Sequence, residues 1–231
     1  MKKIMFNDQY KLTDATVEGY KENTRRIIHD EDINKYLSSL SKGILMVDTK
    51  LVSVDVQPKV IIPEKDCSAK FQMVTTPEMI DFFIKHFAYY KVGEIVAVAQ
   101  SYKTVYEQNK DFLLNQLAAD DKCLSDLENH AGWRNKENVC AYYMPHQIQF
   151  TGIKIERLQD ISPEDCLKEG VREYDYGFFV PGLYRPHHND GVEMGFINPI
   201  DAFATLIDKV SRKGTWDKNP WVFAYKYKKV K

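Results

Sequence analysis

Cysteine is scarce in this chain, and its spacing excludes two classes of protein. The four cysteines form neither a Cys-x-x-Cys pair nor a cluster with histidine; they are Cys67, Cys123, Cys140 and Cys166. A zinc finger and the disulfide framework of a small secreted domain both need such closely spaced residues. We therefore expect reduced thiols, with Cys140 in a strand and Cys166 in a helix as small core residues.

Membrane and export signals are also lacking. No segment approaches the roughly 20 apolar residues that a membrane-spanning helix needs, and the opening residues 1–8 lack the apolar stretch of a signal peptide. Lysine and arginine (32) nearly balance aspartate and glutamate (33), so any contact with nucleic acid must come from a local basic patch. The sequence predicts one cytoplasmic domain over residues 1–231, with no membrane partner.

Common catalytic and metal-binding signatures are absent as well. The sequence contains no glycine-rich phosphate loop, no Gly-x-Ser-x-Gly motif and no recognisable Cys-His pair. His187 and His188 lie near Asp190 and Glu193, but no second spaced pair of ligands accompanies them, and we interpret this segment as an exposed loop. We expect no cofactor and no requirement for a metal.

The most informative stretch that is present begins at Gly19 and ends at Arg26. Glycine can adopt the left-handed conformation that ends a helix. A strand then begins near Thr24, with Thr24 and Arg26 on one face and Arg25 on the other. Lys21, Thr24 and Arg26 can therefore converge on one side of a helix-to-strand loop and hold an anionic or polar ligand. The alternative is a surface loop whose charges face water.

The rest of the chain predicts an α+β fold. Apolar runs with partial alternation indicate strands, and Thr-Pro or Ser-Pro before an acidic residue indicates the start of a helix. The expected strands lie within 3–6, 24–28, 44–62, 94–100, 138–143, 147–158 and 221–230, with an irregularity near Gly152; the expected helices are 9–18, 30–42, 76–87, 163–169, 199–210 and one or two between 103 and 130. Residues 172–198 show no periodicity and are expected to form a long loop. About five or six of these strands, with helices between them, suggest a small mixed β-barrel.

The stretch from Gly19 to Arg26 resembles the Gly-x-Lys-x-x-Thr-x-Arg signature that opens ASCH domains, which are small β-barrels of the PUA-like superfamily. Three further segments are similar to this family in the same order: Tyr90–Val98 to its second strand, Ile153–Ser162 to the strand before its short acidic helix, and Gly214–Phe223 to the closing segment of phage and prophage ASCH-like proteins. The resemblance covers roughly half of the chain. Segments at about 30–88, 103–132 and 172–197 lie outside it and are expected to be insertions with flanking helices.

This resemblance implies a protein that binds RNA or a modified nucleoside or nucleotide in a cleft beside the signature loop. Lys21 and Arg26 would supply cations toward a phosphate or a base carbonyl. The expected ligand-binding residues are Gly19, Lys21, Thr24, Arg25, Arg26 and Trp221.

One bacterial branch that resembles this signature is an amidohydrolase that removes acetyl from N4-acetylcytidine. Its catalytic lysine, threonine and helix-borne glutamate fall on Lys21 as base, Thr24 as nucleophile and Glu169 as acid, which gives a second hypothesis. Glu164 and Asp165 compete with Glu169 for the last role.

Two positions depart from the signature, because Glu22 and Asn23 replace residues that are commonly small or apolar. A carboxylate at position 22 predicts an ion pair with Lys21, and such a pair favours the charged ammonium. A third hypothesis is a phage-derived structural or interaction module whose insertions make the contacts.

Overall fold

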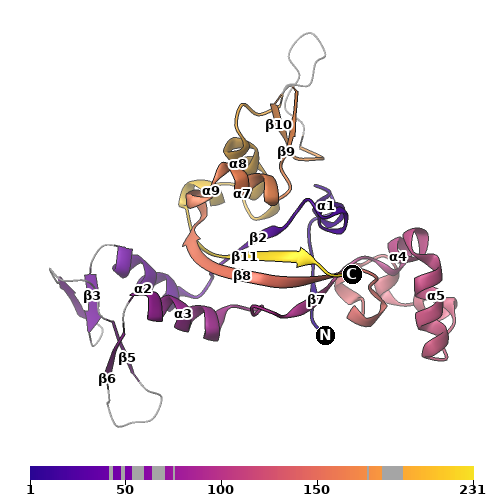
Figure 1. The fold of residues 1–231 in the computed structure, drawn as a ribbon, viewed down its shortest axis with the longest axis horizontal. Helices are drawn as coiled ribbons and strands as arrows, with labels where there is room; N and C mark the ends of the chain where they lie inside the picture. The colour runs from indigo at the N-terminus through magenta and orange to yellow at the C-terminus, as the bar shows by residue number, and fades with distance from the viewer. Residues whose placement is uncertain are drawn as a thin grey trace.

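The structure, a computed structural model, describes residues 1–41, 44–47, 50–53, 60–63, 71–74, 76–175, 177–183 and 195–231. Its centre is a five-stranded sheet in the order β1-β7-β8-β11-β2 (Figure 1). These strands are β1 (Lys3–Ile4), β2 (Asn23–Ile27), β7 (Ile95–Val98), β8 (Gln147–Arg157) and β11 (Trp221–Lys229). β1 runs parallel to β7, and the other neighbours are antiparallel. The fold is mixed α+β, as the sequence predicts.

The two long strands β8 and β11 hold the sheet together. β11 is buried on both faces over its first half, since Val222 and Ala224 are buried as well as Phe223 and Tyr225. The β8–β11 register shifts beside Gly152, which confirms the predicted irregularity. Such a bulge increases the local twist of a strand pair.

The outer strands β1 and β2 form the two edges of this sheet. No ladder of hydrogen bonds joins them among the described residues. The side chain of Arg26 bridges the edges, because its Nη2 donates at 2.9 Å to the carbonyl of Met5, which follows β1. The structure thus confirms a five-stranded α+β sheet and does not close it into the predicted barrel.

The helices begin where the sequence places caps. Ser162 Oγ accepts the Asp165 N–H at 3.1 Å at the start of α7, Asn198 Oδ1 accepts the Asp201 N–H at 2.8 Å at the start of α8, and Asp30 caps α2. Gly19, with φ 88°, ends α1 as predicted. The bounds are α1 (Leu12–Glu18), α2 (Glu31–Ser41), α3 (Thr76–Phe87), α4 (Tyr102–Gln108), α5 (Lys110–Ala119), α6 (Leu124–Glu128), α7 (Pro163–Lys168), α8 (Pro199–Val210) and α9 (Thr215–Lys218).

The prediction of a strand over 138–143 is wrong. These residues contain short 3-10 turns, Lys136–Asn138 and Ala141–Tyr143. The Cys140 N–H donates to the Tyr102 hydroxyl at 2.8 Å, so a side chain from α4 takes the hydrogen bond that a strand would direct to its neighbour. Cys140 is also exposed, which corrects its assignment to the core.

Two further predictions need correction. Residues 102–128 form the helices α4, α5 and α6, where one or two were expected. The segment expected to be an irregular loop contains an antiparallel hairpin of β9 (Arg172–Tyr174) and β10 (Gly177–Phe179).

The region predicted to contain a strand over 44–62 forms parts of two hairpins that are separate from the central sheet. β3 (Ile44–Val47) pairs with β4 (Lys50–Ser53), and β5 (Val60–Pro63) pairs with β6 (Phe71–Val74). Pro63 is the last residue of β5, and a proline cannot donate to a further ladder hydrogen bond.

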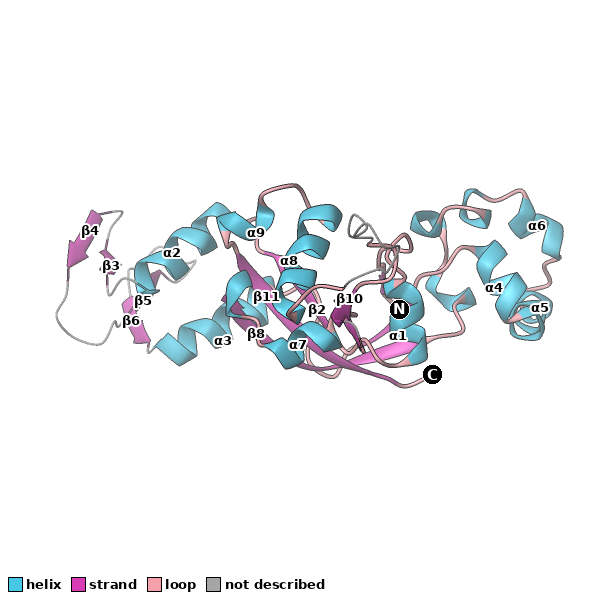
Figure 2. Ribbon diagram, turned by 90° about the horizontal axis from the view of Figure 1, so that it is seen from above, coloured by secondary structure: helices cyan, strands magenta, loops and turns pink. Residues whose placement is uncertain are grey.

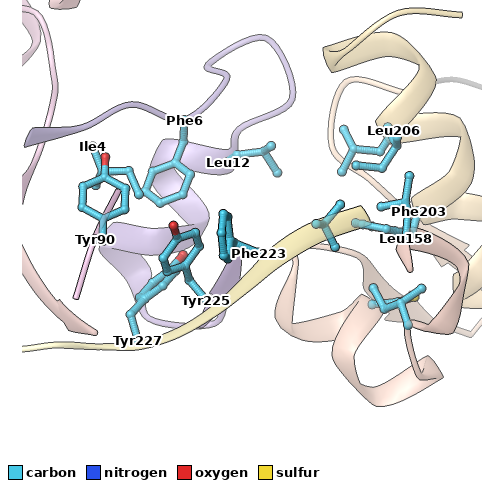
Figure 3. Close-up of a cluster of buried hydrophobic side chains, with 14 of the residues drawn as sticks. Ile4, Phe6, Leu12, Tyr90, Leu158, Phe203, Leu206, Phe223, Tyr225 and Tyr227 are labelled. Carbon is cyan, nitrogen blue, oxygen red and sulfur yellow. The ribbon is translucent and has the colours of Figure 1, made fainter. Parts of the chain in front are cut away.

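Figures 1 and 2 show how these parts are arranged around the sheet. α7, α8 and α9 cover one face, α2 and α3 with the two hairpins extend from one end, and α4–α6 extend from the other. The main core contains aromatic side chains of β11, α8 and the β1 edge, several of which are labelled in Figure 3. A second hydrophobic cluster lies beneath α4–α6 and includes Tyr102, Leu113, Leu117 and Tyr143.

Alkylation of cysteine tests this packing. Cys166 is fully buried, and burial raises the pKa of its thiol to about 12, whereas Cys123 and Cys140 are exposed. Because the thiolate is the nucleophile, we expect iodoacetamide at pH 8 to label Cys123 and Cys140 in the folded protein and to label Cys166 only after denaturation. Peptide mapping by mass spectrometry measures this. Equal labelling of Cys166 and Cys123 in the folded protein would contradict the packing of α7.

Candidate functional site

Lys21 follows the end of α1, and its ammonium is turned inward. The N–H groups of Tyr20 and Lys21 donate to the Ala15 carbonyl at 3.1 and 3.0 Å, which folds the chain back against the helix. Lys21 Nζ donates to Asn23 O at 2.7 Å, to Glu169 O at 2.8 Å and to Glu169 Oε2 at 2.7 Å. An ammonium has three N–H donors, so all of them are used, and the side chain is only 2% exposed.

Arg25 binds three carboxylates at once. Its Nη1 donates to Glu169 Oε1 at 2.9 Å, its Nε to Glu156 Oε1 at 2.9 Å and its Nη2 to Asp165 Oδ2 at 3.2 Å. The planar guanidinium suits this arrangement because its five N–H donors point outward in a fixed fork. Glu169 is shared, with one oxygen bound to Lys21 and the other to Arg25.

Two more side chains complete what we call the buried charge network. Lys154 Nζ lies 2.6 Å from Glu156 Oε2, and Asn23 Nδ2 donates to Asp165 Oδ1 at 3.0 Å. The network contains the cations Lys21, Arg25 and Lys154 and the carboxylates Glu156, Asp165 and Glu169, so its formal charges cancel. Balance of this kind is what permits charged groups to be buried.

The sheet register brings this network together. Arg25 on β2 lies opposite Ala224 on β11, which lies opposite Lys154 on β8. Asn23 and Glu156 are two residues away from Arg25 and Lys154 along their strands, so all four side chains share one face. α7 carries Asp165, and Glu169 follows its end. The network therefore joins three strands to one helix.

Thr24 and Arg26 lie on the opposite face of β2, as predicted. They stand across from Tyr225 and Phe223 on β11. Thr24 is 5% exposed, and its hydroxyl makes no hydrogen bond with any described residue. Arg26 is exposed and forms no ion pair with a described carboxylate; its one bond is to the Met5 carbonyl. These two side chains have polar groups available for a ligand.

A cavity of about 280 Å³, which we call the edge cavity, lies between the two edges of the open sheet. One wall is polar and comes from the signature stretch, and the other is apolar and comes largely from α8. Figure 3 labels four of the apolar residues: Phe6, Leu12, Phe203 and Leu206. The complete lining is Met5, Phe6, Asn7, Leu12, Lys21, Thr24, Arg25, Arg26, Ile27, His29, Glu169, Phe203, Leu206, Ile207, Val210 and Ser211.

The pKa values of Lys21 and Asp165 both lie below their usual values, for different reasons. Desolvation lowers the pKa of Lys21; the Glu169 carboxylate opposes this shift, and the positive charges of Arg26 and Arg25 add to it. Desolvation alone would raise the pKa of Asp165, but the cations Arg25 and Lys154 outweigh it, and the pKa lies below its usual value. The site therefore contains an ionised Asp165, and the amine of Lys21 loses its proton more readily than that of an exposed lysine.

Comparison with known proteins does not assign this site. No family model, curated protein or solved structure matches this chain. We therefore infer the function from the geometry of the cavity and from the sequence resemblance.

Five of the predicted residues line the edge cavity together: Lys21, Thr24, Arg25, Arg26 and Glu169. Among the three candidate acids, Glu169 is the one bonded to Lys21, whereas Glu164 is exposed and Asp165 binds Arg25 and Asn23. The predicted pair between Glu22 and Lys21 is wrong, since Glu22 is exposed and the ammonium binds Glu169.

Two predicted ligand-binding residues do not line the edge cavity. Gly19 is exposed and ends α1. Trp221 Nε1 donates to Ser38 Oγ at 3.3 Å, and the Arg157 guanidinium lies 4.3 Å from the centre of the indole ring. Trp221 therefore helps to attach α2 to the end of the sheet.

The sequence interpretation missed Lys154 and Glu156 as members of the site. They alternate with Ile153 and Ile155 along β8, so two charges share one face of a strand that the pattern places inside the protein. Charges at such positions indicate a buried ionic partner, and this signal was available in the sequence.

The predicted absence of a metal centre concerned His187, His188, Asp190 and Glu193, which lie outside the described residues. Within the described ranges, no group of three or more His, Cys, Asp or Glu side chains is placed to hold a metal ion. None of the helices that the structure describes is both long and apolar enough to cross a membrane.

Proposed function

We propose that the edge cavity binds a nucleoside or nucleotide, either free or within RNA, and that the open sheet corresponds to the PUA-like barrel of an ASCH domain. The observation that supports this most directly is the pair of available polar groups, the Thr24 hydroxyl and the Arg26 guanidinium, beside the apolar wall of α8. The cavity volume of about 280 Å³ is close to the lower limit of roughly 300 Å³ for small-molecule sites. This size suits one nucleoside.

The two walls of the edge cavity would contact different parts of a nucleoside. Ile27 and Val210, which are partly exposed, provide an apolar surface for the flat face of a base. Thr24 can both donate and accept a hydrogen bond, and Arg26 can donate to a base carbonyl or a phosphate. The buried charge network, three members of which also line the cavity, holds β2 in place, so these groups are preorganised.

Replacing Thr24 with valine tests this proposal with little disturbance of the fold. The hydroxyl has no hydrogen-bond partner among the described residues, so we expect the free energy of unfolding to change by less than about 0.5 kcal/mol. The affinity for N4-acetylcytidine or cytidine should fall by roughly fivefold to tenfold, because a ligand hydrogen bond is lost. Isothermal titration calorimetry measures this, with Thr151→Val, at an exposed position of β8, as the matched control. An unchanged affinity would contradict the role of Thr24.

A second candidate function, hydrolysis of an N4-acylated cytidine, is favoured by one observation. Lys21, Thr24 and Glu169 line the same cavity, and Lys21 Nζ donates to Glu169 Oε2 at 2.7 Å. A lysine whose pKa is lowered can act as a base toward a hydroxyl nucleophile.

The proposed reaction has two steps, transfer of the acyl group to Thr24 and hydrolysis of the resulting ester. Neutral Lys21 takes the proton of the Thr24 hydroxyl, whose oxygen attacks the acyl carbon. The bond from that carbon to N4 breaks, and the proton passes from Lys21 through Glu169 to the leaving amine. Water then attacks the threonine ester with Lys21 again as base, which releases a carboxylic acid and regenerates the hydroxyl.

Release of cytidine from N4-acetylcytidine tests this second function. We expect product to accumulate in proportion to protein and time, as followed by liquid chromatography, and Thr24→Val to abolish it. Absence of turnover at high protein concentration would contradict the hydrolase and leave nucleoside binding in place.

A further inference from the structure

A second cavity lies next to the edge cavity and has a different character. Its volume is about 560 Å³, and we call it the basic cavity; it is lined by Met1, Lys2, Lys3, Met5, Arg26, Tyr89, Tyr90, Val139 and Ala141. Met5 and Arg26 line both cavities, so the two meet at these residues. Three cationic side chains and no carboxylate line the basic cavity.

The charges of Arg26 and Lys3 are not neutralised by any described carboxylate. Lys3 Nζ donates to the carbonyls of Glu137 and Val139 at 2.6 and 2.7 Å, which leaves one N–H free. Arg26 uses one N–H on Met5, so four of its five donors remain. Lys2 differs, because it pairs with Glu94 at 3.1 Å. The cavity therefore has the electrostatic character of an anion site.

An exposed aromatic side chain stands beside these cations. Tyr89 is 65% exposed, and its ring packs edge-on against Tyr90 at 4.8 Å between centroids. Tyr90 is in turn stacked on Phe150 at 4.5 Å, which fixes its position. Lys2 Nζ lies 4.7 Å from the centroid of Tyr89. Cationic side chains next to an exposed aromatic ring are the elements that single-stranded nucleic-acid sites combine.

We propose that the basic cavity is a phosphate subsite, so that the ligand of this protein is a phosphorylated nucleoside and not a free one. Arg26, on the wall shared by both cavities, binds the phosphate attached to the nucleoside in the edge cavity, and Lys3 supplies the second cation. Tyr89 stacks on the neighbouring base when the ligand is a strand. This inference rests on the proposed function of the edge cavity.

The phosphate and the neighbouring base can be tested separately with three probes. These are cytidine, cytidine 5′-monophosphate and a single-stranded RNA pentanucleotide with cytidine at its centre, titrated calorimetrically at low salt. We expect the monophosphate and the pentanucleotide to bind at least tenfold more tightly than cytidine, since charge-assisted hydrogen bonds to phosphate are added. An advantage of the pentanucleotide over the monophosphate identifies a strand as the ligand, and equal affinity identifies a mononucleotide.

Variants of the basic cavity complete the test. Lys3→Gln should remove most of the gain from phosphate and lower the salt dependence of pentanucleotide binding by roughly 0.7 in log–log slope, while cytidine binding stays unchanged. Lys3→Arg should restore the gain, which excludes a folding defect as the cause. Tyr89→Ala should weaken the pentanucleotide alone by about tenfold. Lys218→Gln, at an exposed position of α9, is the charge-matched control.

The possible failures are distinguishable. Equal affinities for cytidine and its monophosphate, with no effect of Lys3→Gln, would overturn the phosphate subsite and leave the edge cavity as a nucleoside site. If none of the three probes binds, both the phosphate subsite and the proposed binding of a nucleoside in the edge cavity are contradicted.

Discussion

Replacing Arg25 with methionine should lower the free energy of unfolding by about 3–5 kcal/mol, the cost of breaking a buried ion pair by removing one partner. Arg25 is the one cation that contacts all three carboxylates of the buried charge network, Glu156, Asp165 and Glu169. Without it, these carboxylates share only Lys21 and Lys154. Methionine keeps much of the side-chain volume, so the loss reports on charge more than on packing. Urea unfolding followed by circular dichroism measures it.

Arg26→Met is the matched control for this prediction. The residue is next to Arg25 on the same strand, but it is exposed and makes one hydrogen bond to the Met5 carbonyl. We expect a loss of less than about 1 kcal/mol. Equal losses for the two variants would show that Arg25 does not organise a buried network.

The pH dependence of the Arg25→Met loss follows from Asp165. Burial opposes ionisation of this carboxyl, yet the cations Arg25 and Lys154 lower its pKa in the folded protein below the usual value of 3.8. In the pH interval between these values the unfolded state binds more protons, so the contribution to stability is complete above about pH 4 and is lost as the pH falls through the folded pKa. The difference between wild type and Arg25→Met should therefore narrow below about pH 4.

Replacing Lys21 with methionine should have the largest effect on chemistry. If the edge cavity hydrolyses N4-acetylcytidine, the loss of the base should lower kcat/KM by roughly 10²–10⁴-fold. The wild-type rate should rise with pH through the lowered pKa of Lys21, and hence below pH 10.5, because the neutral amine is the reactive form. This rise should be missing in Lys21→Met. Initial rates of cytidine release across pH measure both effects.

Lys154→Met is the control that distinguishes a loss of the catalytic base from damage to the buried charge network. Lys154 belongs to the same set of ion pairs, but its side chain is 47% exposed and does not line the edge cavity. We expect it to retain turnover within a few-fold of wild type. If Lys154→Met lowered kcat/KM as much as Lys21→Met does, Lys21 would act by stabilising the fold and not as a base.

Local patterns predicted most of the secondary structure. Proline and capping residues locate the starts of α7 and α8, and Gly19 locates the end of α1, because these effects depend on neighbours in the chain. The strand predicted over 138–143 failed because the Tyr102 hydroxyl takes the Cys140 N–H. That contact depends on how α4 packs, which periodicity does not encode. Whether the sheet closes into a barrel was likewise not predictable from pattern. The strands β7, β8 and β11, which lie far apart in the chain, set the positions of the two edges β1 and β2.

The composition of the candidate site was predictable in part. Alternation along β2 correctly separates Thr24 and Arg26 from Arg25. The choice of Glu169 over Glu164 and Asp165 needed the structure, because three acidic residues within one short helical segment differ only in the direction each one faces. The inward turn of Lys21 also depends on tertiary contacts, since Glu22 was a nearer partner in sequence than Glu169.

The central claim, that the edge cavity is the ligand site, is tested most directly by titrating the protein with N4-acetylcytidine and with cytidine 5′-monophosphate while recording backbone amide chemical shifts by NMR. We predict saturable shifts concentrated at residues that line the cavity from four separate segments, such as Phe6, Thr24, Glu169 and Leu206. Shifts confined to surfaces remote from β2 and α8, or no shifts at millimolar ligand, would contradict it.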